Sequence, residues 1–263
     1  MGADAVALLK RSGANRSQRA LTTPSAPGNS PVYRRLARLV GLVFRLASRE
    51  VWDDASALPA EGGVIAVSNH LSYADPLAVG RYLIWSGRWP RYLGKAELWT
   101  MPVVGWFARA CGQIPVYRNS VRAKDALSAA EAALAAGECI AIYPEGGRSR
   151  DPEKWPQTAR SGVGRLALIS GVPVIPIANW GLQHLLSPSG HAKDGWWRRP
   201  RIEVIMGDPV DLSDLAGRRD AEAAKLATER IMAAVTALVE QLRGEPAPET
   251  MWDPRKKTRV PRR

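Results

Sequence analysis

Residues that bind metals or form disulfides are scarce in this chain of 263 residues. It contains two cysteines, Cys111 and Cys139, and three histidines. The two cysteines lack the spacing of a metal site and allow at most one disulfide bond. We therefore expect two reduced, packed thiols, as in a cytosolic protein, and no metal site.

Long apolar runs are missing as well. No stretch of about 18 uncharged apolar residues occurs, which excludes a simple membrane-spanning helix, so any membrane contact is expected to be peripheral. The opening residues, MGADAVALLKR, contain too short an apolar run for a secretory signal, and Val6 replaces the Ser or Thr of a myristoylation signal. Residues 10–30 are rich in Arg and Ser and contain no acidic residue, so an organelle transit peptide stays an alternative for this segment.

Acidic residues are fewer than basic ones. The chain has 25 Asp and Glu and 37 Lys and Arg, which gives a net charge of +12. This balance predicts an anionic partner, which can be a nucleic acid, an anionic membrane surface or a phosphorylated substrate. The chain has no zinc-finger, basic-leucine or RNP-type motif and only two phenylalanines, which disfavours nucleic acid. We therefore expect an anionic membrane surface and a phosphorylated substrate as partners, and no nucleic acid.

Apolar residues, in contrast, make up 46% of the chain, which is enough for the core of a large domain. Short runs rich in β-branched residues alternate with segments of helical periodicity. This alternation predicts an α/β fold with a mixed, largely parallel central sheet flanked by helices. We expect one catalytic domain over residues 31–243, a flexible lead-in over residues 1–30 and a basic, solvated tail over residues 244–263. Two prolines within residues 172–179 predict an edge or irregular strand.

Residues 32–52 combine apolar residues at helical spacing with five arginines, which predicts a basic amphipathic helix. Two interpretations stay open: a helix packed on the domain with a solvated basic face, or an interfacial helix among lipid headgroups. Attraction to the cytoplasmic leaflet is about 1 kcal/mol per basic residue, so these arginines and the basic tail favour reversible membrane association. Four tryptophans either line an entrance that faces the membrane or pack in the core: Trp85, Trp89, Trp99 and Trp106.

The stretch from Val64 to Pro76, VIAVSNHLSYADP, carries a histidine and an aspartate at the junction of two predicted elements. Its continuous apolar run predicts a strand buried on both faces, and Pro76 suits the first position of a helix with Asp75 as its N-cap. Acyl transfer to a hydroxyl needs a base for the hydroxyl proton, and a carboxylate behind an imidazole fixes its tautomer and stabilises the imidazolium. His70 and Asp75 can supply this pair. The His-x4-Asp spacing also occurs by chance, with an aspartate that only caps a helix. The two roles are compatible, because one carboxylate has two oxygens.

A second polar segment, PEGGRS at residues 144–149, follows another predicted strand. Its guanidinium group and free backbone N–H groups suit a phosphate, although an ordinary surface turn has the same composition. Arg118 stands at the end of its own predicted strand. If these strands are neighbours in a parallel sheet, His70, Arg118 and the 144–149 turn all lie at carboxyl ends of strands, where such sheets bind ligands.

Four ordered blocks of the sequence carry a family resemblance. They are NHLSYADP at residues 69–76, GKAEL at 94–98 with GQIPVYR at 112–118, YPEGGRS at 143–149 and VPVIPIA at 172–178. In this order they resemble the blocks of the glycerolipid acyltransferase family, whose bacterial type member is 1-acylglycerol-3-phosphate acyltransferase. Four blocks in order are far more specific than any one of them.

The resemblance implies roles for individual residues. His70 would be the general base on the acceptor hydroxyl, and Asp75 would orient it. The second and fourth blocks would shape the acyl channel, and Lys95 would lie on the polar surface of the site. The residues that would bind and place a phosphorylated acceptor are Arg118, Glu145, Gly146, Arg148 and Ser149, with Glu145 holding glycerol hydroxyls or Arg148.

The resemblance also implies a reaction. The chain would move a fatty acyl group from acyl-CoA or acyl carrier protein to the free hydroxyl of a lysophospholipid, at the cytoplasmic face of a membrane. The first candidate acceptor is 1-acylglycerol 3-phosphate, which would become phosphatidate. No metal or bound cofactor is required. We expect no acyl-enzyme, because no G-x-S-x-G elbow or other activated nucleophile is visible.

Two positions depart from the family pattern. Gly147 replaces the usual Thr of the third block, and Arg160 stands for the usual Lys that follows it. Both bear on the acceptor, so a glycolipid or another lysophospholipid stays an alternative acceptor, as does a transacylase reaction. The non-enzymatic alternatives are a basic nucleic-acid-binding protein and a lipid-binding module, and the presence of both His70 and Asp75 argues against the second.

Overall fold

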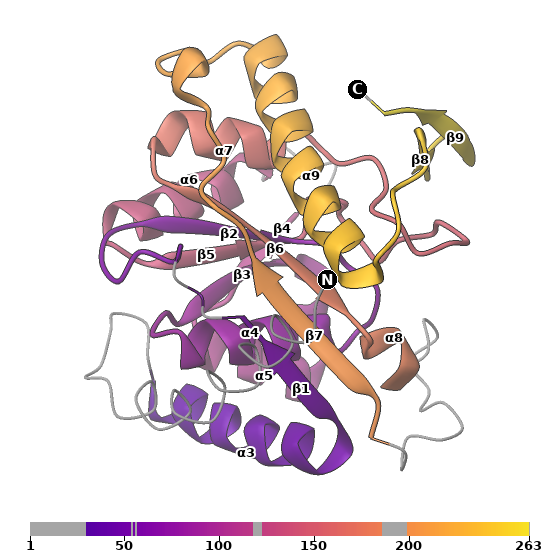
Figure 1. Cartoon of the computed structure of the whole chain (residues 1–263). Helices are drawn as coiled ribbons and strands as arrows, with labels where there is room; N and C mark the ends of the chain where they lie inside the picture. The colour runs from indigo at the N-terminus through magenta and orange to yellow at the C-terminus, as the bar shows by residue number, and fades with distance from the viewer. Residues whose placement is uncertain (1–29, 54, 56, 118–122, 186–198, 263) are drawn as a thin grey trace.

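The computed structural model describes residues 30–53, 55, 57–117, 123–185 and 199–262. Its central strands are β1 (Arg49–Trp52), β2 (Val64–Ser68), β3 (Pro90–Lys95), β4 (Ile114–Val116), β5 (Cys139–Ile142), β6 (Val174–Trp180) and β7 (Arg201–Met206). They form one seven-stranded sheet in the order β1-β7-β6-β2-β5-β3-β4 (Figure 1). Every neighbouring pair is parallel except β6 and β7. The predicted mixed, largely parallel sheet is confirmed.

The helices of the described ranges are α3 (Pro31–Ala47), α4 (Asp75–Trp85), α5 (Pro102–Ala110), α6 (Ala123–Ala135), α7 (Gly162–Ser170), α8 (Leu182–Leu185) and α9 (Ala221–Arg243). Short 3-10 turns occur at η1 (Ala96–Thr100) and η3 (Ser213–Leu215). Helices α6, α7 and α9 cover one face of the sheet, and α4 covers the other, with α3 and α5 packed outside α4 (Figure 1). The sheet is therefore the middle of three layers.

Strand β2 lies at the centre of the sheet, and its side chains alternate between two cores. Val64 and Ala66 pack towards α4, whereas Ile65 and Val67 pack towards α6, α7 and α9. All four are at most 2% exposed. A strand covered on both faces needs apolar side chains at every position, which explains the continuous apolar run. Because β5 and β6 are its parallel neighbours, the three strands end at one edge of the sheet.

The prediction that residues 172–179 form an edge or irregular strand is wrong, since β6 lies between β2 and β7. The antiparallel pairing of β6 with β7 begins only at Ile177, opposite Met206. Pro176 accepts a hydrogen bond of 3.0 Å from the N–H of Gly207, beyond the end of β7. Proline has no backbone N–H to donate, and the paired residues of β6 and β7 do not extend to Pro176. An interior strand therefore tolerates this proline.

The predicted helix over residues 32–52 is shorter than expected, because α3 ends at Ala47 and residues 49–52 form β1. Ser48 adopts an extended conformation, and its hydroxyl donates to the carbonyl of Phe44 over 2.7 Å. One face of α3 is buried against the domain, as the first interpretation expected, but its other face also carries exposed apolar residues. Within the described ranges, no helix has both the length and the apolar character needed to cross a membrane.

The prediction of a solvated tail over residues 244–263 is also wrong. This segment forms an antiparallel hairpin of β8 (Thr250–Asp253) and β9 (Thr258–Pro261). Arg262 donates to the carbonyl of Pro248 over 2.8 Å and to the hydroxyl of Thr236 on α9 over 3.1 Å. Figure 1 shows the hairpin beside α9 and far from α3. The two most basic segments of the described chain therefore lie on different sides of the molecule.

Candidate active site

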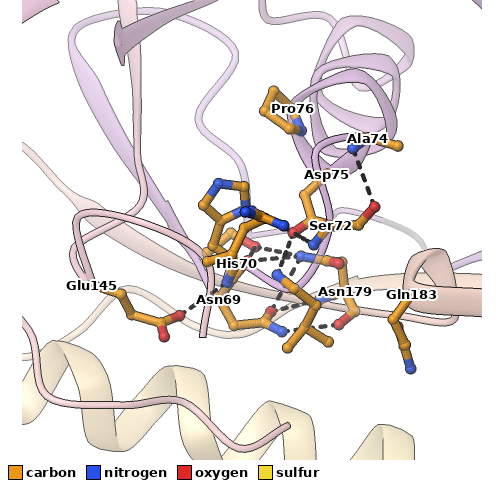
Figure 2. Close-up of polar contacts among 12 residues, drawn as sticks. Asn69, His70, Ser72, Ala74, Asp75, Pro76, Glu145, Asn179 and Gln183 are labelled. Atoms are coloured by element: carbon orange, nitrogen blue, oxygen red, sulfur yellow. Dashed lines mark hydrogen bonds and ion pairs between the residues drawn. The ribbon is translucent and has the colours of Figure 1, made fainter. Parts of the chain in front are cut away.

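His70 follows the end of β2 by two residues and lies at the carboxyl edge of the sheet. Its Nδ1 is 2.8 Å from Asp75 Oδ2 (Figure 2). The imidazole side chain is 15% exposed, whereas the carboxylate of Asp75 is fully buried. With Nδ1 donating to the carboxylate, Nε2 is left to accept a proton. The structure thus brings the two predicted catalytic residues together.

Asp75 is not the N-cap of α4, as predicted, but its first residue, and Ala74 holds the cap position. Instead of capping the helix, Asp75 Oδ2 accepts the N–H groups of Leu71 and Ser72, over 2.5 and 2.8 Å. The carboxylate therefore closes the loop that leads from His70 into α4. Asp75 Oδ1 is buried, and no hydrogen-bond partner for it exists in the described part of the chain.

Three aromatic rings form a column behind the site. The imidazole of His70 stacks on Tyr143, with ring centroids 4.4 Å apart, and Tyr143 stacks on Tyr92 at 5.9 Å. Burial raises the pKa of both phenols, so they remain neutral. The column gives the imidazole a flat, uncharged support. Sequence reasoning missed Tyr143, although its place just before the polar turn was the available signal.

The backbone of His70 is held by the turn that follows β5. Its N–H donates to Glu145 Oε1 over 2.9 Å, and its carbonyl accepts the N–H of Ser149 over 2.7 Å. The other oxygen of Glu145 accepts the N–H of Gln157 over 3.2 Å. Burial raises the pKa of Glu145 to about 8. Both carboxylate oxygens are bonded to backbone groups, which differs from the predicted contact with glycerol hydroxyls or Arg148.

Ser149 and Gly146 also contribute to the shape of this turn. The Ser149 hydroxyl is buried and donates to the carbonyl of Trp155 over 2.7 Å, so it points into the protein. Gly146 has φ +72, which favours glycine, and a Cβ there would lie 3.3 Å from Arg160 Nε. Gly146 therefore allows both the turn and the close approach of Arg160.

Cationic side chains surround the same edge of the sheet. Arg148 lies with its Cζ 3.7 Å from the ring centroid of Tyr73 and donates to the Tyr73 hydroxyl over 2.9 Å. Lys95, at the end of β3, is 52% exposed and pairs with Glu97 over 3.2 Å. Arg118 lies outside the described residues. Of the predicted cationic residues that the structure describes, Arg148 is thus the one bonded to the loop that connects His70 to Asp75.

A buried pair of asparagines lies next to His70 and was not predicted as a pair. Asn69 Nδ2 donates to the carbonyl of Asn179 over 3.0 Å, and the N–H of Asn179 donates to Asn69 Oδ1 over 2.9 Å (Figure 2). Asn179 Nδ2 in turn donates to the carbonyl of Asn69 over 2.8 Å. Both residues are completely buried. The pair fixes the end of β2 against β6 directly before His70.

The thiols are free and buried, as predicted. Burial raises the pKa of Cys111 to about 11 and that of Cys139 to about 12, which makes both unreactive near neutral pH. No cluster of three or more His, Cys, Asp or Glu side chains suited to a metal occurs among the residues that the structure describes. The chemistry available at this edge is that of a histidine and a carboxylate.

The described residues thus form a three-layer α/β fold with a histidine and an aspartate paired at the carboxyl edge of the sheet. Residues 52–180, close to half of the chain, match the family model described as Acyltransferase. The resemblance identified from the four sequence blocks is confirmed.

Individual relatives agree with this assignment. The chain is 29% identical over 147 residues to the chloroplastic 1-acyl-sn-glycerol-3-phosphate acyltransferase BAT2 of Brassica napus, covering 56% of this chain and 40% of that protein. It is 23% identical over 194 residues to the 1-acyl-sn-glycerol-3-phosphate acyltransferase of Streptococcus pneumoniae, covering 72% of this chain and 66% of that one. The matches thus span less than two thirds of these relatives.

The fold is shared with a solved structure. The crystal structure of the 1-acyl-sn-glycerophosphate acyltransferase PlsC from Thermotoga maritima superimposes with a TM-score of 0.60. The alignment covers 93% of each chain at 23% sequence identity. The α/β architecture is therefore common to both proteins across nearly their whole length.

Proposed function

We propose that this chain transfers a fatty acyl group from acyl-CoA or acyl carrier protein to the free hydroxyl of a lysophospholipid. The first candidate acceptor is 1-acylglycerol 3-phosphate, the substrate in the names of the relatives above, with phosphatidate as product. The observation that carries the proposal is the contact of 2.8 Å between His70 Nδ1 and Asp75 Oδ2 at the carboxyl edge of the sheet.

In the proposed reaction, the acceptor hydroxyl binds at His70 Nε2, which takes its proton as the oxygen attacks the thioester carbonyl. Asp75 stabilises the imidazolium that forms. The tetrahedral adduct then collapses, the carbon–sulfur bond breaks, and the thiolate takes the proton from the imidazolium. The products are the ester and a free thiol, so no acyl-enzyme is formed and no cofactor is used.

The phosphate of the acceptor would bind near the 144–149 turn. Arg148 Nη1 has no hydrogen-bond partner in the described part of the chain, and the side chain of Arg160 lies beside Gly146. Two guanidinium groups next to a glycine turn suit a phosphate, because charged hydrogen bonds favour an anion. Gly147 lacks the side-chain hydroxyl of the usual Thr and leaves the backbone of the turn freer. A bulkier acceptor is therefore the alternative to 1-acylglycerol 3-phosphate.

The proposal includes peripheral binding to an anionic membrane, at its cytoplasmic face. Exposed arginines on α3 alternate with exposed apolar residues, and α5 packs beside α3 and exposes a further apolar group. Burying such side chains in the headgroup region is favourable, and the arginines attract anionic lipids. The exposed apolar residues of α3 and the η1–α5 segment are Leu39, Leu42, Val43, Leu46, Leu98, Met101, Val103, Val104 and Trp106.

The fold changes which basic residues support this membrane contact. The C-terminal hairpin packs against α9, on the side of the sheet opposite α3, so its lysines and arginines do not add to the arginines of α3 on one membrane surface. Trp85 and Trp89 are buried in the core, whereas Trp106 is exposed. The membrane proposal therefore rests on α3 and α5.

A panel of acceptors tests the function. Purified protein is incubated with acyl-CoA and, in separate reactions, 1-acylglycerol 3-phosphate, glycerol 3-phosphate, other lysophospholipids and a glycolipid acceptor, while thiol release is followed. We expect turnover with 1-acylglycerol 3-phosphate and none without an acceptor. Turnover with a different acceptor alone would replace the substrate assignment, and silence with every acceptor, using either acyl-CoA or acyl carrier protein as donor, would refute the acyltransferase proposal.

A further inference from the structure

The C-terminal hairpin is bonded to a loop, residues 149–158, that follows the candidate catalytic turn. This loop contains Asp151, whose side chain is completely buried. Arg259 on β9 donates to Asp151 Oδ1 over 2.9 Å and lies 3.3 Å from the carboxylate of Glu153. The N–H of Glu153 also donates to Asp151 Oδ1 over 2.8 Å. Since a buried carboxylate is costly without cationic and hydrogen-bonding partners, the guanidinium of Arg259 helps to make this position of Asp151 favourable.

Further contacts from the C-terminal part of the chain hold the same loop. The N–H of Thr158 donates to the carbonyl of Trp252 on β8 over 2.9 Å. Arg243, at the end of α9, places its Cζ 3.9 Å from the ring centroid of Trp155 and donates to the carbonyl of Glu153 over 2.6 Å. The 149–158 loop is therefore fixed from outside at several points along its length.

On its inner side, the loop is bonded to His70. The N–H of Ser149 donates to the carbonyl of His70, and the Ser149 hydroxyl donates to Trp155 within the loop. The N–H of Gln157 donates to Glu145, whose second oxygen accepts the N–H of His70. Both backbone groups of His70 thus depend on a loop that the hairpin holds in place.

We propose that the C-terminal hairpin is part of the active centre and that Arg259 is a positioning residue for His70, acting through Asp151 and the 149–158 loop. Without Arg259, the buried carboxylate of Asp151 loses the guanidinium bonded to it, so the loop loosens and the two backbone contacts of His70 weaken. The kinetic consequence rests on the proposed function, whereas the structural consequence rests on the contacts alone.

Hydrogen exchange tests the structural part. Arg259→Gln is compared with Arg259→Lys and with the matched control Lys256→Gln, which changes an exposed residue in the turn of the same hairpin. We expect exchange in peptides covering residues 69–72 and 145–158 to become about tenfold faster or more in Arg259→Gln, because these segments open locally. Exchange in α6 and α7 stays unchanged, Arg259→Lys recovers part of the protection, and Lys256→Gln matches the unmodified protein.

Kinetics test the positioning role. We expect kcat in the thiol-release assay to fall about tenfold or more in Arg259→Gln, since small displacements of a general base reduce rates strongly, with the KM for the acyl donor nearly unchanged. The Asp151→Asn and Arg259→Gln double variant should lose no more activity than the worse single variant, because both changes remove one contact.

Two results would overturn the proposal. One is exchange in residues 145–158 that does not differ between Arg259→Gln and Lys256→Gln. The other is faster exchange throughout α6, α7 and α9 with an unchanged kcat per folded molecule, which would make Arg259 a purely structural residue. If the unmodified chain acylates no acceptor, the proposed function fails, and the exchange experiment still decides whether the hairpin holds the loop around His70.

Discussion

The N–H of His70 donates to Glu145 Oε1 over 2.9 Å, although the two residues are 75 positions apart in the sequence. The contact joins the loops that follow two adjacent parallel strands, β2 and β5. The candidate base is thus held by its backbone as well as by the carboxylate behind its ring. Residues that contact the ring of His70 are therefore distinct from residues that hold its backbone.

Replacing His70 removes the proposed base. We expect His70→Ala to lower kcat by a factor of about 10²–10⁴ or more, the usual contribution of a general base. Folding should change little, because the glutamate and serine contacts to residue 70 use its backbone. Thiol-release kinetics and circular dichroism are the measurements, and full activity in this variant would end the proposed mechanism.

Two substitutions of Asp75 should separate its roles. In Asp75→Asn, the amide oxygen can still accept the N–H groups of Leu71 and Ser72, so the loop persists while stabilisation of the imidazolium is lost. In Asp75→Ala, these buried donors lose their acceptor, at a cost of about 1–3 kcal/mol each. We expect low activity in both variants, and a clearly lower free energy of unfolding in denaturant only for Asp75→Ala. Equal stability of the two would contradict the role of Asp75 in the loop.

The raised pKa of Glu145 predicts a pH dependence of stability. Burial raises this pKa from its usual value to about 8, so the folded protein binds a proton that the unfolded chain releases near its ordinary pKa. The resulting stabilisation is fully present at acidic pH and is lost as pH rises towards about 8. Denaturant unfolding of the unmodified protein and Glu145→Gln across this range measures the effect. The unmodified protein should lose stability relative to Glu145→Gln as pH rises towards about 8. A gain in stability relative to the variant would show that the carboxyl is ionised in the fold.

Arg148 and Tyr73 offer a test of phosphate binding. Arg148→Ala should raise the KM for a phosphorylated acceptor about tenfold or more, as expected when a charged hydrogen bond is lost. Tyr73→Phe keeps the ring under the guanidinium and removes one hydroxyl contact, so its effect should be smaller. The KM for the acyl donor serves as the internal reference. An unchanged acceptor KM in Arg148→Ala would place the phosphate elsewhere.

The membrane proposal predicts that α3, and not the hairpin, controls lipid binding. Leu42 and Leu46 are exposed on α3, and each buried leucine contributes about 1.5–3 kcal/mol when removed from water. The Leu42→Glu and Leu46→Glu double variant should therefore bind vesicles that contain an anionic phospholipid about tenfold or more weakly in sedimentation assays. Lys256→Gln, on the hairpin, should bind as the unmodified protein does. The reverse pattern would assign membrane contact to the C-terminal segment.

Local sequence patterns predicted most of the fold and the central pair of the site. The continuous apolar run of β2 requires cover on both faces, and the four residues between His70 and Asp75 are few enough for the two side chains to meet in a turn. These features depend on neighbours in the chain, which is why the sequence alone was informative.

Predictions that depended on distant partners were less successful. Pro176 fits an interior strand because β7 ends at Met206, opposite Ile177. The hairpin is held by Thr236 and Asp151, which lie far away in the sequence. The charge of Glu145 suggested a polar ligand, but the fold places backbone N–H groups at both of its oxygens. No pattern within the 144–149 turn distinguishes these outcomes.

The paired asparagines have a consequence for the rigidity of the site. The side-chain amide of Asn69 bonds to the N–H and the carbonyl of Asn179, as a backbone peptide group would. It adds one further rung between β2 and β6 after β2 itself has ended at Ser68. His70 is therefore the first residue beyond a sheet that is hydrogen-bonded up to its last position. The backbone that carries the imidazole is thus anchored to β6 on one side, and the Glu145 and Ser149 contacts hold it on the other.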